Sequence, residues 1–237
     1  MPVYRLSPDD YRFPPAEGAD HHGIVAVGGD LHPERLLEAY AGGIFPWYSD
    51  GEPILWWSLD PRLILRPAEI HIPRSLKKVL RQGRFEITFD HAFDEVMTNC
   101  GKVREETDGT WITDEMKDAY GALHRLGYAH SCEAWSKDGE GNRVLAGGIY
   151  GVAIGGAFYG ESMFFLQPNA SKVALASLVH QLEHMGFCIM DCQMTTEHMM
   201  RFGAKEISRI MFLENLQRAI LYPIPPRSWA EMKPLPW

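Results

Sequence analysis

Three polar residues at predicted strand ends have side chains suited to proton transfer and to holding a nucleophile. Glu161 lies in the apolar run 157–165, and Asp191 and Gln193 follow the short apolar run 187–190. Residues two apart in a strand point to the same side, so this carboxylate and amide would leave the strand together. A carboxylate can accept a proton, and an amide oxygen can accept a hydrogen bond from an amine. The sequence therefore predicts a cleft in which the three side chains meet.

The elements that must position these residues form one predicted α/β unit. The runs 144–152 and 157–165 are rich in β-forming residues, and a Gly-Gly pair between them is typical of a hairpin. A helix is predicted from Asn169 or Ser171 to Gly186, because apolar residues recur there at helical spacing. Strand, strand, helix and strand in this order indicate a layered α/β fold.

The chain divides into two predicted domains. Asp60-Pro61 indicates a break between secondary-structure elements, and we place the domain boundary near residue 62. The small domain then covers 1–62 and the larger one 63–237. Residues 44–57 hold three tryptophans, which fit either a small aromatic core or a binding wall. Residues 222–237 are rich in proline and are predicted to lie along the surface as an extended tail.

Composition restricts the class of protein. The chain has 237 residues, and its 31 acidic against 23 basic residues give a net charge of -8, which argues against wholesale coating of nucleic acid. The sequence lacks an apolar run long enough to span a membrane, a secretory leader and a C-x-x-C pair. We therefore expect a cytoplasmic protein with reduced thiols.

A short predicted helix carries one basic face. No acidic residue occurs between His71 and Phe85, although the chain as a whole is acidic. Such a local reversal of sign favours a polyanion site over a merely solvated face, most simply for the phosphates of a nucleic acid. The basic residues recur at three- and four-residue spacing and are Arg74, Lys77, Lys78 and Arg81.

A zinc-peptidase signature competes with this interpretation. His180, Glu183 and His184 match the pattern H-x-x-E-H, which places two histidines one helical turn apart. The apolar stripe of the helix, however, runs through Leu178 and Leu182, which leaves the histidines on its flank without a third ligand. We predict no metal and keep a zinc peptidase as an alternative.

Several motifs together resemble those of the bacterial leucyl/phenylalanyl-tRNA–protein transferases. They are GGDLHPERLLEAYAGGIFPWYSDGEPILWWS, EETDGTWIT, GGIYGVAIGGAFYGESMF, NASK and DCQ, in the order of that family, within about Phe13 to Leu216. The family transfers Leu or Phe from aminoacyl-tRNA to the N-terminal Arg or Lys of an acceptor protein, which marks the acceptor for degradation. The resemblance implies a small N-terminal domain, a C-terminal domain similar to Gcn5-related N-acetyltransferases with a mixed sheet and flanking helices, and no cofactor. A CoA-dependent acetyltransferase is the other alternative, but 166–169 replaces the Gly-rich phosphate loop that CoA binding requires.

The resemblance also implies roles for individual residues. Gln193 would hold the attacking amine and Asp191 would orient or polarise it, whereas Glu161 would bind the acceptor's cationic N-terminus or assist proton transfer; which residue takes the proton stays open. An apolar pocket for Leu, Phe or Met is expected from Ile149, Phe158, Leu175, Leu178 and Leu182. Contacts to the terminal adenosine of the tRNA or to the acceptor are expected from Tyr40, Trp47 and Trp111.

Overall fold

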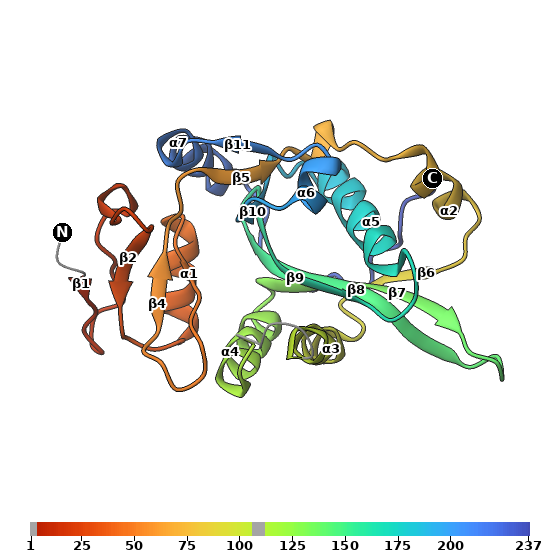
Figure 1. Cartoon of the computed structure of the whole chain (residues 1–237), viewed down its shortest axis with the longest axis horizontal. Helices are drawn as coiled ribbons and strands as arrows, with labels where there is room; N and C mark the ends of the chain where they lie inside the picture. Colours follow the sequence, from red (N-terminus) through yellow and green to blue (C-terminus); the bar gives the residue numbers. More distant parts are fainter. Residues whose placement is uncertain (1–3, 106–111) are drawn as a thin grey trace.

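The computed structural model describes residues 4–105 and 112–237 and has a mixed α/β fold with two sheets (Figure 1). This confirms the predicted fold class. The smaller sheet consists of β1 (Tyr4–Arg5), β2 (Ile24–Val27), β3 (Phe45–Pro46) and β4 (Leu55–Trp57), in the order β1-β2-β4-β3. The larger sheet consists of β5 (Arg62–Leu65), β6 (Glu86–Phe89), β7 (Ala129–Lys137), β8 (Arg143–Ile154), β9 (Ala157–Phe165), β10 (Ile189–Gln193) and β11 (Lys205–Ile207), in the order β11-β5-β10-β9-β8-β7-β6. The chain passes from one sheet to the other between Trp57 and Arg62.

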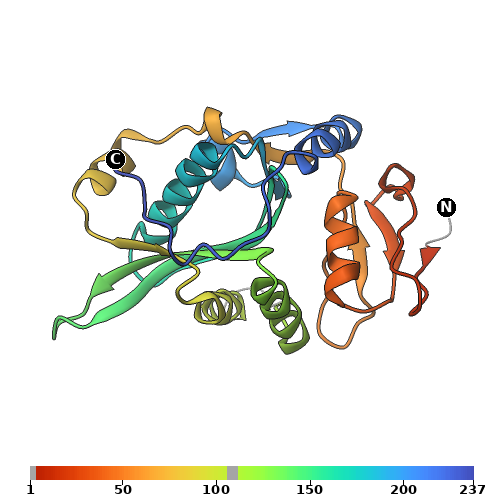
Figure 2. The same ribbon diagram turned by 180° about the vertical axis from the view of Figure 1, so that it is seen from behind.

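Helices cover both faces of the larger sheet. They are α1 (Pro33–Ala41), α2 (Arg74–Arg81), α3 (Phe93–Glu105), α4 (Asp114–Arg125), α5 (Ala170–Met185), α6 (Glu197–Arg201) and α7 (Arg209–Ile220). Figures 1 and 2 show α5 on one face, and α3 and α4 on the other, with α1 beside α4. One buried apolar cluster lies on the α3–α4 face and continues into the smaller sheet, whereas a second lies between the sheet and α5. The sheet therefore separates two cores.

Turn and cap residues explain the central hairpin and helix. A Cβ added to Gly155, which joins β8 to β9 with φ +53°, would lie 2.4 Å from the carbonyl oxygen of Ile220, so only glycine fits. Gly186 adopts a left-handed conformation with φ +85° and ends α5. Both elements were predicted from the sequence, and the structure confirms them.

The two central parallel strands pair over only part of their length. β9 and β10 pair from Ala157 with Ile189 to Tyr159 with Asp191, and β9 then continues along β8 alone. On its other side β10 pairs with β5, and the register shifts between Asp191 and Gln193. This split brings Glu161 of β9 opposite the end of β10.

The C-terminal tail lies only partly as predicted. It is extended, and Figure 2 shows it running across the molecule from α7 towards α2. It lies along the surface as predicted, except at Trp229, which is 2% exposed. Its indole stacks on His130 with ring centroids 3.7 Å apart, and its backbone N–H donates to Asp90 at 2.8 Å. The tail is therefore anchored in the core by one large side chain.

Candidate active site

Glu161 lies at the centre of a buried hydrogen-bonded cluster. Its Oε1 accepts a hydrogen bond from the Tyr40 hydroxyl at 2.8 Å and from the Gln193 amide nitrogen at 3.1 Å. Its Oε2 lies 3.3 Å from the Tyr120 hydroxyl, and the two hydroxyls also contact each other, so two hydroxyl protons are shared among three contacts. These side chains come from α1, α4, β9 and β10, so the cluster forms where the N-terminal part of the chain meets the split in the large sheet.

The environment of Glu161 keeps its carboxyl group near half-ionisation at neutral pH. Burial raises the pKa of Glu161 to about 7, with a further contribution from the negative charge of Asp191, although the hydrogen bonds from Tyr40, Gln193 and Tyr120 oppose the rise. Burial also raises the pKa of both tyrosines well above 10.0, so they remain donors. A carboxylate with a pKa near the working pH is suited to accepting and returning a proton.

Asp191 is tied to a different partner. Its Oδ1 and Oδ2 accept hydrogen bonds from Nε and Nη2 of Arg62 at 2.9 and 2.6 Å, and both side chains are almost completely buried. The Arg62 guanidinium also lies over the rings of Phe45 and Phe212, at 4.8 and 4.4 Å from their centroids. Because both carboxylate oxygens bind a permanent cation, this geometry suits positioning rather than proton transfer.

Asp191 positions Gln193 through the backbone. The N–H of Gln193 donates to Asp191 Oδ1 at 2.9 Å, and Gln193 has a left-handed backbone with φ +59°. A non-glycine residue in this region costs of order 1–3 kcal/mol, so the surrounding hydrogen bonds must hold it there. The Gln193 amide nitrogen donates to Glu161, and the amide oxygen receives no hydrogen bond from the described residues. That oxygen is free to accept one from an amine.

The structure brings together two of the three strand-end residues directly. Glu161 and Gln193 are in contact, whereas the carboxylate of Asp191 turns to Arg62. Neither Arg62, the first residue of β5, nor Tyr120 of α4 was among the site residues expected from the sequence. The available signal was a charged residue at the start of a strand that is otherwise apolar.

The five expected pocket residues lie on the opposite face of the sheet from Glu161. All belong to the apolar cluster between the sheet and α5, and each is at most 2% exposed. They pack with one another and not with the polar cluster. Their role in holding an aminoacyl side chain stays a prediction for Ile149, Phe158, Leu175, Leu178 and Leu182.

The three expected aromatic contacts have different surroundings. Tyr40 is completely buried and its hydroxyl is bound to Glu161. Trp47 is 38% exposed, and its ring lies 5.6 Å from that of Trp57. Trp111 lies outside the described residues. Of these, the described structure therefore places only Tyr40 in the cluster.

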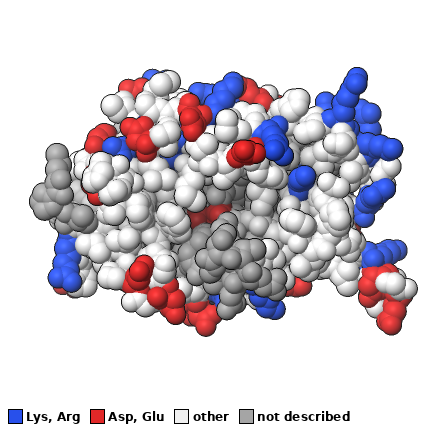
Figure 3. Space-filling model, in the orientation of Figure 1, with Lys and Arg blue, Asp and Glu red and all other residues white. Residues whose placement is uncertain are grey.

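The predicted basic helix is present as α2, and its cations are exposed. Arg74, Lys77, Lys78 and Arg81 line a shallow concavity of about 430 Å³ together with Gln82. Figure 3 shows Lys and Arg side chains gathered on the right-hand end of the molecule, where α2 lies in Figure 1. Leu76 and Leu80 bury the other side of the helix. The basic face is thus available to a polyanion.

The histidine motif on α5 does not form a metal cluster. The ring of His180 lies 4.8 Å from that of Trp237, and Glu183 and His184 are exposed. Within residues 4–105 and 112–237, no group of three or more His, Cys, Asp or Glu side chains could hold a metal ion. None of the described helices is long and apolar enough to cross a membrane.

Comparisons with known proteins give matches over nearly the whole chain. The family model described as leucyl/phenylalanyl-tRNA protein transferase matches residues 64–217, and the model of its N-terminal domain matches residues 29–60. A relative named leucyl/phenylalanyl-tRNA–protein transferase from Magnetococcus marinus is 64% identical over 99% of this chain and 100% of its own length. A relative of the same name from Myxococcus xanthus is 52% identical over 98% of this chain and 97% of its own length.

Two solved structures are more distant. FemX has a TM-score of 0.49 and 12% identity, covering 74% of this chain and 66% of its own. L-PGS from Bacillus licheniformis has a TM-score of 0.44 and 10% identity, covering 79% of this chain and 70% of its own. The sequence relatives and the family models, rather than these structures, define the class: the chain is an aminoacyltransferase. It belongs to the leucyl/phenylalanyl-tRNA–protein transferase family. The comparisons support neither the zinc-peptidase nor the CoA-dependent alternative.

Proposed function

We propose that this chain transfers Leu or Phe, with Met as a further candidate, from aminoacyl-tRNA to the α-amine of an N-terminal Arg or Lys of an acceptor protein. The product carries a new N-terminal residue that marks it for degradation. The observation that carries the proposal is the buried Glu161, whose pKa is raised to about 7 and which is hydrogen-bonded to Gln193, in a chain of this family. The tRNA donor supports a cytoplasmic location, since aminoacyl-tRNA is made in the cytoplasm.

The chemistry requires positioning and one proton acceptor. An aminoacyl ester is already activated, so holding the neutral amine against its carbonyl can supply up to roughly 7–11 kcal/mol. The Gln193 amide oxygen accepts a hydrogen bond from the amine. As the C–N bond forms and the ester C–O bond breaks, the amine proton moves to Glu161, which returns it to the departing ribose oxygen. Tyr40 and Tyr120 hold the carboxylate in place throughout.

The aminoacyl side chain requires apolar surroundings. The apolar cluster expected to provide them lies on the face of the sheet opposite Glu161. Beyond the pairing of Tyr159 with Asp191, no ladder joins β9 to β10. We propose that the side chain passes through this split into the apolar cluster on the α5 face. A single methylene changes discrimination by only about 1–3 kcal/mol, so Leu, Phe and Met should all be accepted to different extents.

The decisive test is a transfer assay with purified protein. We expect label from Leu-tRNA in a peptide that begins with Arg, and none in the same peptide with an acetylated N-terminus.

Leu178→Trp should raise the donor KM by about tenfold or more, because the larger side chain fills the apolar cluster. Adding a chelator should leave the rate of transfer unchanged. Absence of labelled peptide at saturating donor would refute the function, and loss of transfer on chelation would restore the metal alternative.

The basic face of α2 gives a prediction about salt dependence. Lys77→Glu with Arg81→Glu should weaken tRNA binding and reduce the slope of log K against log salt by about one for each phosphate that is no longer neutralised. The matched control is Arg5→Glu with Arg218→Glu, which changes the net charge equally on exposed residues of β1 and α7, two elements that lie away from α2 (Figure 1). Equal slopes for the two double variants would show that α2 does not contact the phosphates of the tRNA.

A further inference from the structure

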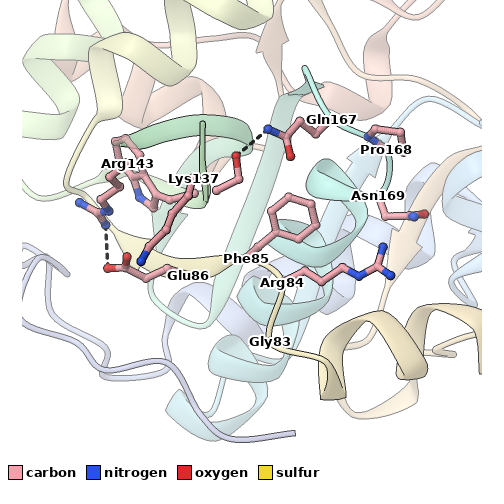
Figure 4. Close-up of a pocket in the computed structure, with 11 residues that line it drawn as sticks. Gly83, Arg84, Phe85, Glu86, Lys137, Arg143, Gln167, Pro168 and Asn169 are labelled. Atoms are coloured by element: carbon pink, nitrogen blue, oxygen red, sulfur yellow. Dashed lines mark hydrogen bonds and ion pairs between the residues drawn. The ribbon is translucent and has the colours of Figure 1, made fainter. Parts of the chain in front are cut away.

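A second pocket lies next to the end of α2. It has a volume of about 670 Å³ and is formed where the segment after α2, the end of the β7–β8 hairpin next to its turn and the β9–α5 connection meet (Figure 4). A volume of this size is in the range of pockets that hold one small ligand. It shares no residue with the hydrogen-bonded cluster around Glu161.

Two half-buried aromatic rings provide flat apolar surface in this pocket. Phe85 comes from the segment between α2 and β6, and Trp135 comes from β7. The Trp135 indole donates to the Thr88 hydroxyl at 2.7 Å, which fixes its ring. The Arg143 guanidinium lies 4.1 Å from the centroid of a Trp135 ring. A fixed indole combined with a guanidinium is a surface on which a nucleic-acid base can stack.

Most of the charged side chains in the pocket are cationic, and two of these cations have no ion-pair partner among the described residues. Glu86 is paired with Arg143 at 3.0 Å, which neutralises the one acidic residue of the lining. Arg84 and Lys137 are exposed and have no ion-pair partner among the described residues. The remaining charge is therefore positive, in a chain whose net charge is -8.

Amide groups complete the lining. The Gln167 amide nitrogen donates to the Ser136 hydroxyl at 2.6 Å, which leaves its carbonyl oxygen available (Figure 4). Asn169 precedes α5 but makes no side-chain cap hydrogen bond to it. Amide side chains can donate to and accept from the edges of a base. Rings, cations and amides together match a nucleotide rather than a simple anion.

We propose that this pocket binds one nucleotide of the donor tRNA, with its base against Trp135 and Phe85 and its phosphates near Arg84 and Lys137. The pocket begins at Gly83, directly after Gln82 at the end of the basic face of α2. The pocket therefore continues the basic face of α2 along the chain, and both surfaces carry exposed cations. A folded RNA backbone, with regularly spaced phosphates, fits these two adjoining surfaces better than an acidic peptide, which would leave the aromatic rings and amides without complementary groups. This inference rests on the proposed function, because it takes aminoacyl-tRNA as the donor.

Photo-crosslinking tests the location directly. A photoreactive amino acid in place of Pro168, which is exposed and lines the pocket, should crosslink to full-length Leu-tRNA. The same amino acid in place of Leu221, which is 82% exposed on another part of the molecule, is the control and should not. Absence of an RNA crosslink at 168, or a crosslink to the acceptor protein instead, would overturn the inference.

Binding measurements test the chemistry. Arg84→Glu with Lys137→Glu should weaken tRNA binding by about tenfold or more and reduce the salt slope by about two, since two phosphates are then left without a cation. The double variant Arg5→Glu with Arg218→Glu again serves as the charge-matched control. Trp135→Phe should preserve more affinity than Trp135→Leu, because it keeps a ring for stacking. Equal affinities for the pocket variants and the control would contradict the proposal.

The wild-type transfer assay separates the two proposals. Transfer without a crosslink at 168 refutes only the nucleotide pocket. A crosslink to tRNA without transfer refutes only the proposed reaction. Circular dichroism of each variant shows whether a loss of binding is accompanied by loss of the fold, and the Trp135→Phe and Trp135→Leu pair provides a comparison at the same position.

Discussion

Glu161→Gln is expected to slow single-turnover transfer by about 100-fold or more near pH 8, the scale of a lost general base. Glutamine matches the carboxyl group in shape and cannot take the amine proton. Because the pKa of Glu161 is about 7, its ionised form dominates at pH 8 and disappears as the pH falls towards 6. The ratio of wild-type to variant rate should therefore decrease with falling pH, approaching tenfold per unit below 7.

Dividing the wild-type rate by the variant rate cancels the effect of the titration of the acceptor's α-amine. The α-amine of a peptide has a pKa of roughly 7.7–8.0, which affects wild type and variant equally. Gln193→Ala is the matched comparison: it should also slow transfer by about 100-fold, because it removes the group that holds the amine. It should keep a dependence on pH, shifted to higher pH, because it also removes a hydrogen bond that lowers the pKa of Glu161. A Glu161→Gln profile parallel to that of wild type would show that the proton goes elsewhere.

Arg62→Met is expected to have the largest effect on stability. The change leaves the Asp191 carboxylate buried without its cation, and breaking a buried pair in this way typically costs about 3–5 kcal/mol. The measurement is the free energy of unfolding by denaturant at pH 7, compared between wild type and variant.

A second variant separates positioning from stability. Arg62→Met with Asp191→Leu removes both charges and should recover much of the free energy of unfolding. It should still transfer slowly, because the Gln193 N–H then lacks the acceptor that holds its left-handed backbone. Recovery of both stability and transfer would contradict a positioning role for Asp191. Recovery of neither would indicate that the buried pair is required for folding itself.

Local sequence was sufficient to define the elements around the site. Glycine between two β-forming runs specified the β8–β9 hairpin, and apolar spacing ended by Gly186 specified α5. The basic face of α2 was equally readable, because a helix places residues three and four apart on one side. These features depend on neighbours within a few residues of one another, which is the range over which turn chemistry and periodicity act.

Which buried groups meet depends on tertiary packing. Asp191 binds Arg62 across 129 positions of sequence, and Glu161 receives Tyr40 and Tyr120 from helices at distances of 121 and 41 positions. The anchoring of the tail by Trp229 was hidden for the same reason. Periodicity shows that a side chain is buried but not which other buried face it packs against. The partner of a buried charge is selected by the way the sheets and helices pack, and that choice raises the pKa of Glu161 and fixes Asp191 to Arg62.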